Sequence, residues 1–113
     1  MYLSTANDRI EIVTDASAAT TEPVFTASYQ DITSAGMTLP QSSNQGSTAG
    51  TTDTTLVAAP AASTNRQVTY MSVFNSDTAA RTIRIYKDVS GTEYNLCLTT
   101  LQVGDTLEWS RET

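Results

Sequence analysis

The C-terminal half of the chain is built from runs in which apolar and polar residues alternate, separated by turns too short to hold a helix. The clearest runs are "QVTYMSVFN" (67–75), "RTIRIYKD" (81–88) and "YNLCLTTL" (94–101). Successive side chains of a β-strand point to opposite faces, so a period of two predicts strands. The turns "VSGTE" and "QVGDT" each contain a glycine, and such short connections join antiparallel neighbours. This half therefore predicts an antiparallel sheet ending at "TLEWS" (106–110). The run 67–75, apolar on both faces, is expected to lie centrally or at an interface.

The N-terminal half repeats the pattern less regularly. Alternation predicts strands at "RIEIVT" (9–14) and "PVFTASYQDI" (23–32), and shorter ones at "MTLP" (37–40) and around Leu56 and Val57. No window shows the 3.6-residue period of a helix. The 113 residues fit one domain. We therefore predict an all-β fold, a single antiparallel β-sandwich (jelly-roll or immunoglobulin-like) of about 6–8 short strands over residues 1–113.

The segment "QSSNQGSTAGTTDTT", residues 41–55, has one charged residue and no aromatic or branched aliphatic side chain. It could be a disordered linker, a surface loop, or an arm that gains its shape on a neighbouring subunit. The pieces on either side are too small to be domains, and a long structureless loop inside a domain is uncommon unless it is functional. Small, uncharged residues can lie flat on a neighbour at little desolvation cost. We therefore expect residues 41–55 to be an arm or interface loop, and residues 1–8 to be an extended N-terminal arm.

The charge balance is acidic, with 12 Asp and Glu against 6 Lys and Arg and a net charge of −6. The basic residues form no cluster. Binding to a phosphate backbone or an anionic membrane surface depends on clustered Lys and Arg, so we expect neither a nucleic acid nor a membrane as partner. No apolar stretch approaches the roughly 18 residues of a membrane helix, and no signal peptide is visible. We expect synthesis in a cytoplasm.

The groups that most catalytic sites use are missing. The chain has no His, which removes the commonest general base, the usual Ser-His-Asp arrangement and most zinc sites. "GSTAG" lacks the Lys that a phosphate-binding loop needs. Cys97 is the only Cys and is expected to be a small buried hydrophobe. We predict no enzymatic activity, no cofactor and no metal site, and expect solvated turn or capping roles for Asp31, Asp53, Asp77, Asp88, Glu93 and Asp105.

Two aromatic residues suggest a second type of function. Tyr86 and Tyr94 flank the hairpin that turns at Gly91. An exposed pair of this kind would suit a carbohydrate-binding module, and cross-strand packing is the alternative interpretation. Phe25, Phe74 and Trp109 are expected to pack in the core.

Four parts of the chain carry a resemblance to a known class of proteins. They are "YLSTANDRIEIVTDASA", the Ser/Thr/Gly-rich middle, "APAASTNRQVTYMSVFNSDTAARTIRIYKD" and "LQVGDTLEW". Together they resemble small all-β structural proteins of tailed bacteriophages, which occur as head decoration (cement) proteins and as tail-associated proteins. The resemblance transfers no catalytic residue. It implies a place in the virion, on the capsid exterior or the tail, with the major capsid protein or other virion proteins as partners. It also implies a homo-oligomer, which we expect to be a homotrimer.

The leading hypothesis from the sequence is a phage decoration or cement protein that binds the outer capsid surface and stabilises the particle. The alternative is a tail-associated protein or a carbohydrate-binding module for recognition of the host surface. The residues expected to contact partners are Tyr2, Leu3, Arg9, Ser42, Asn44, Gly46, Thr52, Thr55, Tyr86 and Tyr94.

Overall fold

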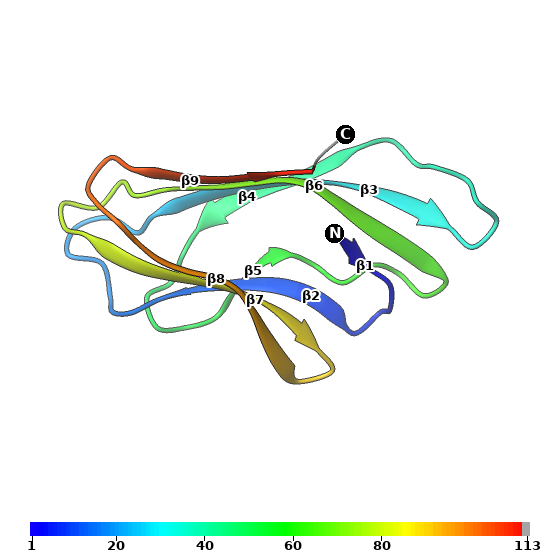
Figure 1. Cartoon of the computed structure of the whole chain (residues 1–113), viewed down its shortest axis with the longest axis horizontal. Coiled ribbons are helices and arrows are strands. Elements are labelled where there is room, and N and C mark those ends of the chain that lie inside the picture. The colour runs from blue at the N-terminus through cyan, green and yellow to red at the C-terminus, as the bar shows by residue number, and fades with distance from the viewer. Residues whose placement is uncertain (112–113) are drawn as a thin grey trace.

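The computed structural model describes residues 1–111 and has nine strands in two antiparallel sheets that pack face to face (Figure 1). In the first sheet, β1 (Tyr2–Leu3), β6 (Thr64–Phe74), β3 (Val24–Thr33) and β4 (Ser42–Ser47) are neighbours in that order, and β9 (Thr106–Ser110) also pairs with β6. In the second sheet the order is β5 (Thr54–Val57), β2 (Asp8–Thr14), β7 (Arg81–Val89) and β8 (Thr92–Leu101). The prediction of an antiparallel β-sandwich is confirmed.

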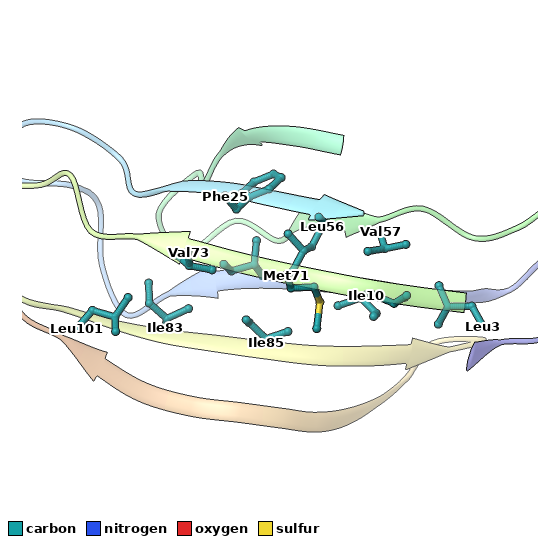
Figure 2. Packing of buried hydrophobic residues seen from close by; sticks show 13 residues of the cluster. Leu3, Ile10, Phe25, Leu56, Val57, Met71, Val73, Ile83, Ile85 and Leu101 are labelled. Carbon is teal, nitrogen blue, oxygen red and sulfur yellow. The ribbon is translucent and has the colours of Figure 1, made fainter. Parts of the chain in front are cut away.

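The core lies between the sheets (Figure 2). On β7, Ile83 and Ile85 alternate inward as the pattern predicts, and β2 contributes Ile10 and Ile12 in the same way. Removal of these side chains from water is the main force that holds the two sheets together. The full buried cluster is Leu3, Ile10, Ile12, Phe25, Ala27, Leu56, Val57, Val68, Met71, Val73, Ile83, Ile85 and Leu101.

Strand β6 is central in its sheet, as its two apolar faces predict, with β3 on one side and β1 and β9 on the other. Simple alternation along β6 would nevertheless place Val68 on the same face as Tyr70 and Phe74, and not with Met71 and Val73. The pairing with β3 shifts register between Ser28 and Tyr29, which leaves Thr69 as an extra residue. A bulge of this kind reverses the facing of the side chains that follow it. Val68 therefore lies in the core with Met71 and Val73, while Phe74, expected in the core, is 41% exposed.

The N-terminal segment differs from the predicted arm. Tyr2 and Leu3 pair with Gln67 and Arg66 of β6, and the Val68 N–H donates to the Met1 carbonyl oxygen at 2.9 Å. Leu3 is fully buried. The expectation of an extended arm over residues 1–8 is therefore wrong, because a large apolar side chain in this segment completes the core.

The polar segment 41–55 also differs from the predicted arm or interface loop. Residues 42–47 form β4 against β3, and Thr54 and Thr55 begin β5 against β2. The expected strand at 37–40 is reduced to a single bridge between Ile32 and Thr38. Backbone hydrogen bonds to β3, which a count of apolar side chains does not reveal, bring the polar residues into the sheet.

Packing explains why β4 has a glycine at position 46. Phe25 lies opposite Gly46 on β3 and is almost fully buried. A Cβ at position 46 would lie 3.0 Å from Cζ of the Phe25 ring. The Phe25 ring therefore occupies the space that a side chain at position 46 would need.

Gly46→Val should lower the free energy of unfolding by about 1–3 kcal/mol, because the added side chain forces the Phe25 ring out of its place. Gln45→Val on the same strand, opposite the exposed Thr26 and not Phe25, is the matched control and should change stability by less than about 0.5 kcal/mol. Urea denaturation of both variants measures the difference. Equal stability of the two variants would show that Phe25 can move aside without cost.

Candidate functional site: the open side of the sandwich

The two long sides of the sandwich are different. On one side β4 and β5 are joined, since Nδ2 of Asn44 donates to the carbonyl oxygen of Leu56 at 3.0 Å. On the other side β8 ends one sheet, and β9 lies beside β6 at the border of the other. The tip of the β7–β8 hairpin extends away from the first sheet (Figure 1). The side between β8 and β9 is called the open side below.

A pocket of about 380 Å³ lies on the open side, between the two sheets. This volume is within the range of ligand-binding clefts, and the lining is predominantly apolar. Among the described residues that line the pocket, Glu108 has the only charged side chain, and it accepts a hydrogen bond from Oη of Tyr70 at 3.3 Å. The residues that line this open-side pocket are Met1, Met71, Ser72, Val73, Ile85, Leu96, Cys97, Leu107, Glu108 and Trp109.

Strand β8 borders the pocket, and within residues 1–111 one of its edges has no partner strand. Its ten residues include no Pro and no Lys, and Glu93 is its only charge. Tyr94, Leu96 and Leu98 are 56%, 42% and 65% exposed. The free N–H and C=O groups of an edge strand can pair with another chain, and natural proteins usually protect such edges with Lys or Pro. β8 lacks both and is therefore suited to pairing with a second polypeptide.

The hairpin turn fixes how β8 is presented. Ser90 and Gly91 both have positive φ, 52° and 90°, as a two-residue type I′ loop requires. The register with β7 shifts between Ile85 and Tyr86, which makes Leu96 an extra residue on β8. At this bulge the Leu96 side chain lines the pocket. The turn sets the pairing of β8 with β7, and the bulge places Leu96, a residue of the edge strand, in the lining of the pocket.

The residues expected to contact partners do not form one surface. Ser42, Asn44 and Gly46 lie on β4 and Thr55 lies on β5, on the side where these two strands are linked by a hydrogen bond. Thr52 forms a local bridge with Ala49. Arg9 lies on β2, where it pairs with Glu11 at 2.6 Å and with Asp88 at 3.3 Å. Tyr2 is half-exposed on β1, and Leu3 is buried on the same strand. Tyr86 lies on β7, so Tyr94 is the only one of the predicted contact residues on β8.

The expectation of an exposed aromatic pair is wrong, because Tyr86 is fully buried. The guanidinium carbon of Arg84 lies 4.3 Å from the centre of its ring. Within residues 1–111, the Tyr86 hydroxyl is buried without a hydrogen-bond partner. Burial, together with the nearby Asp53 carboxylate, raises the pKa of Tyr86 above its usual range. Tyr94 is the only member of the pair that another molecule can reach.

Sequence reasoning missed the pocket because its lining comes from distant parts of the chain. Cys97 is half-buried and contributes to the pocket, as do Met71 and Trp109 from the other sheet. The only local indication of the pocket was that β8 alternates apolar and polar residues and carries few charges. That signal does not reveal whether the outer edge of the strand is paired.

Sequence reasoning also missed a buried polar network at the end of the sandwich. Asp77, expected to be a solvated turn residue, is 1% exposed. Its carboxylate accepts hydrogen bonds at 2.7–2.9 Å from the N–H groups of Ala19, Thr20 and Thr78 and from Nε of Arg81. Burial alone would raise the pKa of Asp77, but these donors overcome it and hold the pKa well below its usual range.

Asn75 extends this network to a third connection. Its Oδ1 accepts from the Asp77 N–H at 3.0 Å, and its Nδ2 donates to the carbonyl oxygens of Leu101 and Gln102 at 3.0 and 3.2 Å. The network thus ties together the β2–β3, β6–β7 and β8–β9 connections. Asp88 is buried rather than solvated, but its Oδ1 accepts from the Gly91 N–H at 2.8 Å, which is the turn-capping role expected for it.

The fold and the open side define a class: an antiparallel β-sandwich that has an apolar, unpaired edge strand beside a pocket. The chain matches no protein-family model, no curated protein and no solved structure. Across residues 1–111, no helix is long and apolar enough to cross a membrane. The same residues contain no group of three or more His, Cys, Asp or Glu side chains placed to hold a metal ion.

Proposed function

We propose that the chain is a phage virion structural protein, a decoration or cement protein that binds the outer capsid surface through β8. The observation that carries the proposal is the unprotected edge of β8 with its three exposed apolar residues. Addition of an extended segment to a sheet edge is a common mode of protein recognition. The site differs from the arms expected from the sequence, because residues 2–3, 42–47 and 54–57 pair with other strands of the sandwich itself.

The charge arrangement supports a protein partner. Arg9, Arg66, Arg81, Arg84 and Lys87 are all within 4.0 Å of a carboxylate oxygen. Basic side chains paired in this way contribute little free positive charge for a phosphate backbone. The net charge of −6 favours a partner surface of the opposite sign.

A homotrimer around a local symmetry axis of the capsid remains our proposal for the assembly, since closed symmetry gives each copy the same contact. A tail position is the alternative within the virion. A carbohydrate-binding module would need two or three aromatic rings on one surface, and the burial of Tyr86 removes the best pair. This burial favours the assembly role.

Leu98→Lys should reduce binding to particles about tenfold or more, because a charge on the edge strand opposes strand addition. Met37→Lys is the matched control, since Met37 is 63% exposed, close to the 65% of Leu98, and lies in the β3–β4 turn. Phage particles from a mutant that lacks this gene are incubated with each protein, and the bound chain is quantified by mass spectrometry.

Electron cryomicroscopy of the same particles locates the bound chain. Density on the outer shell supports the decoration role, and density on the tail assigns the alternative. If the unmodified chain does not bind particles, or if both Lys variants bind equally well, the proposed function or its docking strand is wrong.

A further inference from the structure

We propose that the open-side pocket receives a large apolar side chain from an extended segment of the partner protein, and that this segment pairs with β8. The inference rests on the proposed function and adds a second contact to it. Leu96 is common to both features: it belongs to the edge strand and lines the pocket. A segment hydrogen-bonded to β8 would therefore pass the mouth of the pocket.

The dimensions and lining suit an anchor side chain. The pocket, at about 380 Å³, offers Met1 and Met71 as flexible walls and Leu107 and Trp109 as further apolar surface. Met side chains adapt to the shape of what they contact, and buried apolar or aromatic anchors contribute most of the affinity of many interfaces.

A polypeptide segment fits the site better than a free small molecule. The pocket lies beside the unpaired N–H and C=O groups of the β8 edge. A small apolar ligand would fill the cavity and leave those groups unused, whereas an extended segment satisfies both. The single carboxylate in the lining, Glu108, favours a Lys or Arg next to the anchor in the partner sequence.

Two residues that occur once in the chain, Cys97 and Trp109, both line the pocket, so its occupancy can be measured directly. On particle-bound protein we expect N-ethylmaleimide to alkylate Cys97 at least about tenfold more slowly than on free protein. Acrylamide quenching of Trp109 fluorescence should fall in the same sample. Particles without the chain, measured separately, supply the background for the fluorescence.

Chemical filling of the pocket tests the inference without refolding a variant. The folded protein is treated at Cys97 with N-cyclohexylmaleimide, which adds a bulky apolar group, or with methyl methanethiosulfonate, which adds only a methylthio group. We expect the bulky adduct to reduce particle binding about tenfold or more and the small adduct to leave it within about twofold. Cys97→Ser is the control for reaction at other sites, and treatment with either reagent should leave its particle binding equal to that of the same variant before treatment.

The outcomes separate the two proposals. If the chain binds particles while Cys97 reacts as it does in free protein, the pocket inference is wrong and the proposed function stands. A chain that does not bind at all contradicts the proposed function. A small molecule retained in native mass spectrometry of the purified chain would assign the pocket to a ligand. A dimer detected by sedimentation, in which Cys97 is protected from N-ethylmaleimide, would assign the pocket to a second copy. Either result would overturn the inference.

Discussion

Asp77→Asn should lower the melting temperature by at least about 10 °C at neutral pH, the largest loss we expect from one polar substitution. The carboxylate of Asp77 accepts from Nε of Arg81 at 2.7 Å and from N–H groups of two connections. An amide removes the charge and directs a donor toward groups that are themselves donors. Arg81, of which only 10% of the side chain is exposed, would then be left as a buried charge without its partner. Thermal unfolding followed by circular dichroism measures the effect.

Asp105→Asn is the matched control for this substitution. Asp105 is exposed in the β8–β9 turn, and its carboxylate accepts one hydrogen bond, from the Gln102 N–H at 3.0 Å. The same chemical change there should shift the melting temperature by no more than a few degrees, about the effect of one exposed interaction. A loss of less than about 2 °C for Asp77→Asn would contradict the importance of the network.

The pH dependence gives a second readout of the same carboxylate. The pKa of Asp77 is lowered in the folded protein, so its stabilisation is complete above the pKa of an unfolded Asp, about 3.9. It is lost as the pH falls through the lower pKa of the folded state. The difference in melting temperature between the native chain and Asp77→Asn should stay constant from pH 8 to 5 and shrink below about pH 4. A constant difference down to pH 2 would assign the loss to packing.

Leu3→Ala should lower the free energy of unfolding by about 2–5 kcal/mol, the usual cost of truncating a buried Leu. Leu3 is 0% exposed and belongs to the main cluster between the sheets (Figure 2). Removal of its side chain leaves a cavity where β1 meets β6. Urea denaturation, with the slope compared between variants, measures the loss.

Tyr2→Ala provides the control next to it in the sequence. Tyr2 is 51% exposed on the same short strand, so its truncation should cost much less, about 1 kcal/mol or below. This pair of variants also tests the earlier interpretation of residues 1–8. Small, equal effects at both positions would restore the free N-terminal arm, whereas a large difference establishes β1 as part of the core.

Local pattern was sufficient for the strands that carry alternating residues. β2, β3, β6, β7, β8 and β9 all lie where period-two runs predicted them, because the facing of side chains along a strand is a local property. Alternation did not predict which face of the sheet each side chain points to where a strand contains a bulge. The bulges at Thr69 and Leu96 depend on the register with a neighbouring strand, and they decide that Val68 lies in the core and Leu96 beside the pocket.

The amino-acid sequence by itself determined the all-β class, the antiparallel hairpins and the acidic charge, since alternation, turn residues and charge are properties of neighbouring residues. Only the tertiary structure decided that the polar segment around Gly46 becomes β4 beneath Phe25, and that Asp77 is buried. It also decided that β8 is left with an unpaired edge beside a pocket. The physical reason is that pairing and burial depend on groups brought together from distant positions, which no local pattern specifies.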